Sequence, residues 1–179
     1  MSVKRGGTRR VPPPESPGGL EGRTRRILAL LGWGPARLRS PAARWAVNVL
    51  ALAGAALIII SAIIHLHLWD QGYSGIAVIG PLFLAQGVIS IPFAVVLGVF
   101  RRLGLLAAGA ALMAGTAAGL LLSVQVGLFG FKDSLAAPYA GMSLVVEFTA
   151  AGLLAAAAVL IAAARPAPAR PGTRPRRSG

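Results

Sequence analysis

Four long runs of apolar residues, separated by short polar stretches, dominate the hydropathy pattern of this chain. Each run is more than 20 residues long, and about 20 helical residues cross a hydrocarbon core of roughly 30 Å. Lipid offers no partner to backbone amides, so such runs must be helices, and none has the polar face that a soluble bundle requires. The pattern predicts an all-α, polytopic membrane protein, a bundle of four transmembrane helices at about 45–69, 78–100, 103–129 and 142–164.

Composition supports this class and removes several chemistries. Apolar residues make up 55% of the 179 residues and charged residues 13%, about half of the roughly 25% found in soluble domains. The mean hydropathy is +0.71. The absence of cysteine excludes disulfides, thiolate metal sites and cysteine nucleophiles.

Both ends of the chain differ from the apolar centre. Residues 1–44 are rich in arginine, proline and glycine, and they are predicted to be a largely disordered basic segment. Within it, apolar residues among arginines at 23–33 predict a short helix lying on the membrane surface. Residues 165–179 are predicted to be a disordered basic tail.

The basic residues predict the orientation. Of the 18 lysines and arginines, 17 fall before the first run, between the second and third runs, or after the fourth. Lys132 alone lies on the other side of the predicted membrane. The positive-inside rule then places both termini in the cytoplasm. The chain is rich in arginine, alanine and glycine, which indicates a bacterial source. Topology accounts for the basic ends, and it favours the lipid bilayer and its anionic headgroups over nucleic acid as their partner.

Each run carries a polar residue at a similar depth in its outer half: His65, Gln86, Gln125 and Glu147. A carboxyl group in hydrocarbon is costly unless it is protonated or paired. We therefore expect Glu147 to lie near His65, directly or through one water, and to titrate with it. Asp70 lies at the rim of this candidate polar site.

Two interpretations of these residues stay open. His65 and Glu147 are adequate, although weak, candidate ligands for Zn or Cu or candidate members of a proton relay, or they form a structural hydrogen bond between helices. His67 is two residues from His65, so the two side chains point to different sides of one helix. No cofactor is predicted, and a haem between histidines of two spans is excluded because both histidines lie on the first.

Small residues recur every four positions in the third run. Gly115 and Gly119 form a GxxxG motif, which permits close contact with another helix. The partner helix lies either in the same bundle or in a second copy of the chain.

The stretch AIIHLHLWDQGYSGIAVIGPLFLAQGVI (62–89) carries a His-x-x-x-Trp…Gly-Tyr…Ile-Gly-Pro-Leu-Phe pattern. It resembles small actinobacterial four-helix integral membrane proteins. The resemblance implies the same topology and nominates the residues His65, Trp69, Gly72, Tyr73, Gly80, Pro81 and Glu147. It implies no activity.

Three functional classes follow. The first is a non-enzymatic scaffold or accessory membrane subunit, which the sequence favours. The alternative is a small transporter or a metal- or proton-handling protein with an outward-facing His/Glu pocket, which requires a cavity that reaches Glu147. A membrane enzyme ranks last, because no convergent nucleophile or phosphate loop accompanies the candidate residues.

Overall fold

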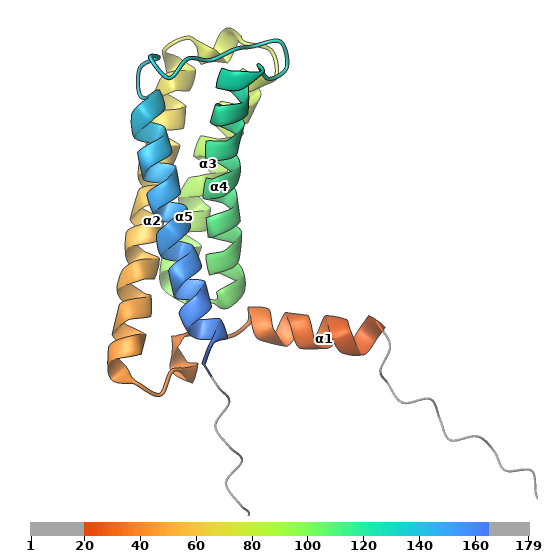
Figure 1. The fold of residues 1–179 in the computed structure, drawn as a ribbon, viewed down its shortest axis with the longest axis vertical. Coiled ribbons are helices and arrows are strands. Elements are labelled where there is room, and N and C mark those ends of the chain that lie inside the picture. Colours follow the sequence, from red (N-terminus) through yellow and green to blue (C-terminus); the bar gives the residue numbers. More distant parts are fainter. Residues whose placement is uncertain (1–19, 165–179) are drawn as a thin grey trace, which may run out of the picture.

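The computed structural model describes residues 20–164, of which 80% are helical. Four helices are long and apolar enough to cross a membrane, so the prediction of an all-α, four-helix transmembrane bundle is confirmed. Predictions on residues 1–19 and 165–179 concern segments outside the described residues. The elements are α1 (Leu20–Leu31), η1 (Pro35–Arg37), α2 (Pro41–Asp70), η2 (Tyr73–Gly75), α3 (Ile79–Phe100), α4 (Leu103–Gln125) and α5 (Ala140–Ala162) (Figure 1).

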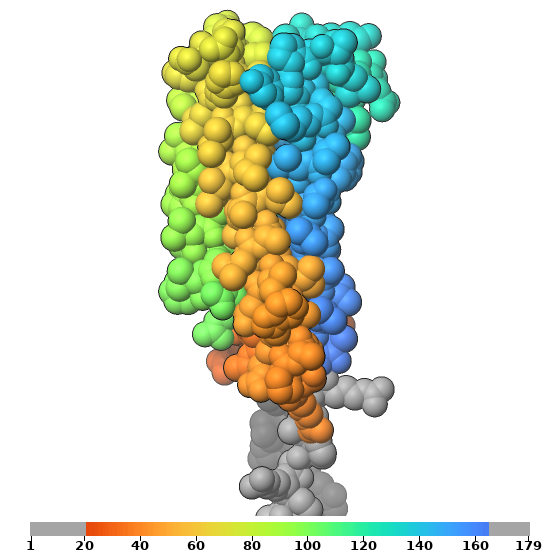
Figure 2. Space-filling view, turned by 90° about the vertical axis from the view of Figure 1, so that its left-hand side faces the viewer, coloured from red at the N-terminus to blue at the C-terminus, as the bar shows by residue number. Residues whose placement is uncertain are grey.

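The four spans form a bundle in which neighbouring helices follow the order α3, α2, α5, α4. Extensive contacts join α2 to α3, α2 to α5, and α4 to α5. The space-filling view shows α2 between α3 in green and α5 in blue (Figure 2). A short turn joins α3 to α4, yet the backbones of these two helices come close at few places, and side chains such as Leu97 bridge the space to Gly109. The bundle therefore has one weakly closed side, between α3 and α4.

The two ends of the bundle differ in character. We call the end with the connections 71–78 and 126–139 the loop end, and the end with α1 and the turn Arg101–Arg102 the arginine end. The main apolar core lies in the half nearer the arginine end, where its fully buried side chains include Ile58, Leu97, Leu106, Met113 and Leu154. The half nearer the loop end holds the buried polar side chains instead.

Close helix contact occurs at glycines other than those predicted. A Cβ atom at Gly54 of α2 would lie 2.6 Å from Leu154 of α5, and one at Gly109 of α4 would lie 3.0 Å from the same leucine. A Cβ atom at Gly115 or Gly119 would meet no atom of the described chain within 4 Å. The expectation that this pair faces a helix of the same bundle is therefore not met in residues 20–164.

The third span ends earlier than its apolar sequence suggests. Helix α4 stops at Gln125 rather than at Phe129. The amides and carbonyls of Leu128 and Phe131 pair with each other, and the intervening Phe129 and Gly130 have φ angles of 51° and 81°. Two successive positive φ angles make a tight hairpin turn, which a continuing helix cannot contain.

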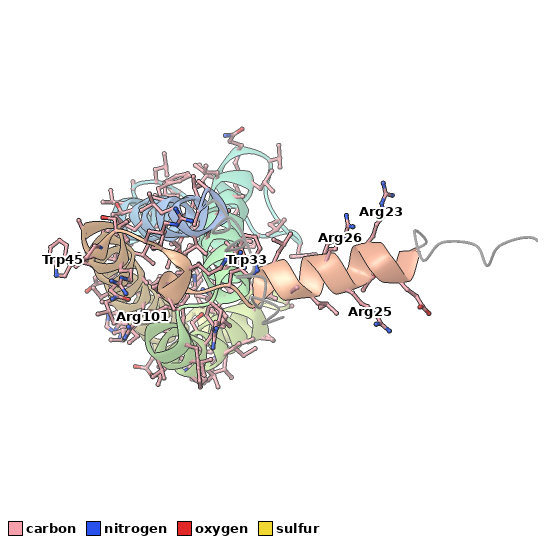
Figure 3. The ribbon with its side chains drawn as sticks, turned by 90° about the horizontal axis from the view of Figure 1, so that it is seen from below. Arg23, Arg25, Arg26, Trp33, Trp45 and Arg101 are labelled. Carbon is pink, nitrogen blue, oxygen red and sulfur yellow. The ribbon has the colours of Figure 1, made fainter. Side chains whose placement is uncertain are left out.

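Residues 20–44, predicted to be largely disordered, are ordered. Helix α1 overlaps the predicted interfacial helix at 23–33 and runs across the axis of the bundle (Figure 1). Its arginines Arg23, Arg25 and Arg26 project sideways (Figure 3), while Ile27 and Leu28 are exposed. An exposed apolar surface flanked by arginines suits a helix in the membrane interface.

Hydrogen bonds fix the segment after α1 to the bundle. The Leu103 amide donates to the Trp33 carbonyl at 2.7 Å, and the Arg102 side chain donates to the Gly32 carbonyl at 3.0 Å. Ser40 then caps α2, accepting from the Ala43 amide at 3.4 Å, with proline in the first turn. These local signals explain why the span begins at Pro41.

Candidate functional site

Glu147 of α5 is the most deeply buried acidic side chain among residues 20–164, with 1% of its surface exposed. Its Oε1 accepts hydrogen bonds from the hydroxyl of Ser61 on α2 at 3.1 Å and from that of Ser143, one turn earlier on α5, at 3.0 Å. One donor is thus local and the other comes from a neighbouring helix, so the carboxyl group ties α2 to α5.

The structure brings His65 and Glu147 together. Nδ1 of His65 lies 2.8 Å from the Ser61 carbonyl, and because a carbonyl only accepts, Nδ1 carries a proton. Nε2 lies 3.9 Å from Oε1 of Glu147, which is too long for a direct hydrogen bond. A bare Nε2 and a carboxylate oxygen are both acceptors, so the pair requires a shared donor: a proton, a water or a ligand.

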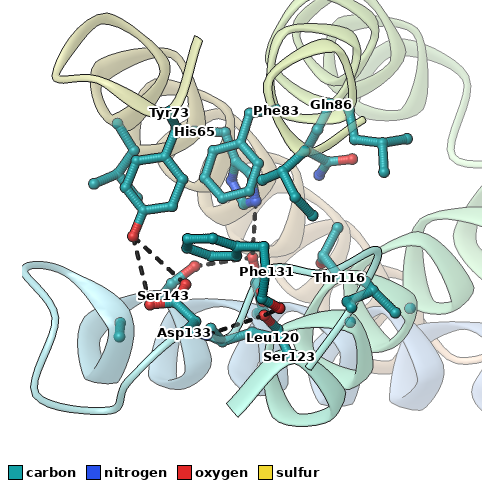
Figure 4. Close-up of a pocket in the computed structure, with 18 of the residues that line it drawn as sticks. His65, Tyr73, Phe83, Gln86, Thr116, Leu120, Ser123, Phe131, Asp133 and Ser143 are labelled. Carbon is teal, nitrogen blue, oxygen red and sulfur yellow. Dashed lines mark hydrogen bonds and ion pairs between the residues drawn. The ribbon is translucent and has the colours of Figure 1, made fainter. Parts of the chain in front are cut away.

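A cavity of about 460 Å³ opens beside this pair (Figure 4). All four spans and both connections of the loop end contribute to its walls, which are mainly apolar. Volumes of this size suit small organic molecules. His65, Gln86 and Glu147, three of the sequence candidates from three different spans, line it together.

Two buried polar atoms of the lining lack partners. Among the described residues, neither Oε2 of Glu147 nor Nε2 of Gln86 has a hydrogen-bond partner. The hydroxyl of Thr116, which also lines the cavity, lies near the Glu147 carboxyl group, but it donates to the carbonyls of its own helix at Leu112 and Met113. Unpaired buried polar groups cost free energy, so these two atoms indicate a missing polar partner.

An aromatic wall closes the cavity toward the loop end. The Phe83 ring lies 4.9 Å from the His65 ring and 4.9 Å from the Tyr73 ring, on which it stacks. Phe131 meets Tyr73 edge-on at 5.7 Å. The Tyr73 hydroxyl donates to both carboxylate oxygens of Asp133 at 3.5 Å. Burial, and to a smaller extent the Asp133 charge and this hydrogen bond, raise the pKa of Tyr73.

The other sequence candidates lie apart from this cluster. Gln125 is exposed at the end of α4, and Asp70 is exposed at the end of α2. Neither lines the cavity. His67 is also exposed and rests edge-on against Tyr139, with 5.3 Å between the rings. The prediction that the two histidines point to different sides is confirmed.

Four lining or supporting residues were not selected from the sequence as site residues: Ser61, Ser143, Thr116 and Asp133. The two serines stand four residues before His65 and Glu147, a spacing that places each pair on one helix face. That spacing was the available signal. No such signal existed for Asp133, because its position depends on the path of a loop.

The metal hypothesis gains no third ligand. Within residues 20–164, no group of three or more histidine, aspartate, glutamate or cysteine side chains is placed to hold a metal ion. His65 and Glu147 are surrounded by hydroxyl groups and rings instead.

Comparisons of the chain with protein-family models, curated proteins and solved structures found no match.

Proposed function

We propose that this membrane protein binds a small molecule in the cavity at Glu147 and serves as a small transporter or carrier for it. One observation carries the proposal: Glu147, a buried residue whose Oε2 has no hydrogen-bond partner among the described residues, lines a cavity large enough for an organic ligand. A purely structural pair needs no cavity, so the geometry favours this hypothesis over the scaffold that the sequence favoured.

The chain would sit in the plasma membrane of a bacterium with its loop end outside. The charge distribution supports this orientation, since 17 of 18 basic residues belong to the segments on the opposite side. The cavity then opens in the outer half of the bilayer. The shared-donor position between His65 and Glu147 gives the protein a place to exchange a proton for a ligand.

A cysteine introduced into this cysteine-free chain tests whether the cavity is open. Ser143 lines the cavity, whereas Ser90, which is also buried, does not. We expect Ser143→Cys to react with N-ethylmaleimide about tenfold faster or more than Ser90→Cys, because only the former thiol meets solvent or a lipid-dissolved reagent.

Gly119→Leu supplies the matched blocking variant. A side chain at this position enters the cavity without meeting described atoms within 4 Å of its Cβ. The variant should fold as the parent does and should protect Ser143→Cys from the reagent. Equal reaction rates of the cysteines at 143 and 90 would contradict the proposal.

A further inference from the structure

The cavity contains more hydrogen-bond acceptors than free donors. The hydroxyls of Ser61 and Ser143 already donate to Oε1 of Glu147, and that of Tyr73 already donates to Asp133. Nδ1 of His65 is bound to a backbone carbonyl. What remains for a ligand is the Glu147 carboxylate, whose buried Oε2 has no hydrogen-bond partner, and Nε2 of His65. Beside them, the Gln86 amide presents its unpartnered Nε2, a donor, and it accepts from a ligand only after the amide group turns over. A ligand that donates several hydrogen bonds fits this set.

The charge of the lining points in the same direction. Its acidic members are Glu147 and Asp133, and no lysine or arginine among residues 20–164 lines the cavity. Carboxylates attract cations strongly where water is excluded. The faces of Phe83, Tyr73 and Phe131 add a surface that favours a cation over a neutral group of the same shape.

The position of the cavity between membrane spans favours a ligand that is largely apolar. Leu82 of α3 and Ala111 and Gly115 of α4 line the cavity and are also exposed. They belong to the two spans whose backbones come close at few places, and Gly115 lies near the middle of its helix. We infer that a ligand enters between α3 and α4, where a gap at this depth would face hydrocarbon rather than water. A molecule that uses it must dissolve in lipid.

We propose that the ligand is a lipophilic amine in its protonated form, which enters between α3 and α4 and places its ammonium group between Glu147 and His65. The ammonium donates to the Glu147 carboxylate and to Nε2 of His65, which lies 3.9 Å from Oε1 of that carboxylate with no donor between them. The apolar body lies against the aromatic wall and α4. This inference rests on the proposed function, because it names the ligand class of the same cavity.

Three probes of one shape separate cation, neutral and anion binding: 2-phenylethylamine, 2-phenylethanol and phenylacetate. Each is titrated calorimetrically into the full chain in lipid nanodiscs, with empty nanodiscs subtracted for partitioning. We expect the amine to bind about tenfold tighter or more than the alcohol, as a charge-assisted hydrogen bond implies, and phenylacetate to bind more weakly than either.

Matched variants assign the preference to the site. Glu147→Gln keeps the shape of the side chain and removes its charge, so the preference for the amine should disappear. Asp70→Asn removes an exposed acidic charge outside the cavity and should preserve the preference. Gly119→Leu leaves residue 147 as glutamate and should abolish amine binding by filling the cavity. The inference therefore stays testable if Glu147→Gln does not fold.

The outcomes distinguish the inference from the function beneath it. Equal binding of amine and alcohol would refute the inference that the ligand is a cation, but not the proposed cavity function. The same holds if no probe binds to a protein whose Ser143→Cys variant reacts rapidly. A preference for the amine that survives both Glu147→Gln and Gly119→Leu places the amine elsewhere and also overturns the inference. A protected cysteine at 143 refutes the cavity function itself.

Discussion

Gly54→Ala tests the packing that holds the spans together. The added Cβ atom would lie 2.6 Å from Cγ and Cδ2 of Leu154, whereas ordinary contacts begin near 3.4 Å. One of the two groups must therefore move by nearly 1 Å. Leu154 is fully buried, and its other methyl group already lies 3.0 Å from the Cβ position of Gly109. Overpacking of this kind costs about 1–3 kcal/mol of the free energy of unfolding.

Gly115→Ala is the control for this measurement. It makes the same chemical change within a span but meets no described atom within 4 Å, so it reports the helix preference of alanine over glycine alone. Both variants can be unfolded with SDS in mixed micelles and followed by near-ultraviolet circular dichroism, which reports tertiary packing. We expect Gly54→Ala to be less stable than Gly115→Ala by about 1–3 kcal/mol.

A double-mutant cycle then identifies the contact. Leu154→Ala removes the clashing atoms, so Gly54→Ala should cost little in that background, and the coupling energy should be about 1 kcal/mol or more. Equal stability of Gly54→Ala and Gly115→Ala would refute the packing argument, and so would a Gly54→Ala cost that Leu154→Ala leaves unchanged.

Three further predictions concern the bond network and the orientation. Ser61→Ala removes the donor from α2 to Glu147 and should lower the free energy of unfolding in detergent by about 1 kcal/mol; wild-type stability would show that this bond contributes nothing. Because the pKa of Tyr73 is raised above its ordinary value of 10.0, the stability linked to its protonated hydroxyl is complete below pH 10 and is lost as pH rises through the higher folded value. In a Tyr139→Phe background, phenolate absorbance should therefore appear above pH 10 and shift down in Asp133→Asn; an unshifted titration would exclude Asp133 as a cause. Ser134→Cys should react with an impermeant thiol reagent outside intact cells, whereas a cysteine in the C-terminal tail should not, and outside labelling of the tail would reverse the proposed orientation.

The sequence predicted axial positions better than directions around a helix. Counting residues from the span ends placed His65, Gln86 and Glu147 at one depth, and the structure collects them at one cavity. The same count included Gln125, which faces away, because depth along a helix says nothing of its rotation. The rotation of each helix about its axis is set by packing between helices. In spans that are apolar on all sides, no polar face in the sequence indicates which side is buried.

The GxxxG motif marks no contact within the described bundle for a related reason, and its alternative partner, a second copy of the chain, stays a prediction. The motif shows where another helix can approach the backbone closely, but not whether a helix packs there. Leu154 fills the space left by Gly54 and Gly109, whereas the space at Gly115 and Gly119 belongs to the cavity. Likewise, the apolar residues Leu128 and Phe129 extended the predicted third span, because the positive φ angle at Phe129 leaves no signature in hydropathy.

The packing order of the spans has a consequence for how the protein is made. Membrane helices enter the bilayer in chain order, and neighbouring spans commonly associate as hairpins as they emerge. Here α3 can dock on α2 as soon as it is inserted, whereas the main packing partner of α4 is α5. The third span must therefore wait in lipid until the fourth has been synthesised. A nascent chain halted after α4 would hold a docked pair and a third span that lacks its main packing partner.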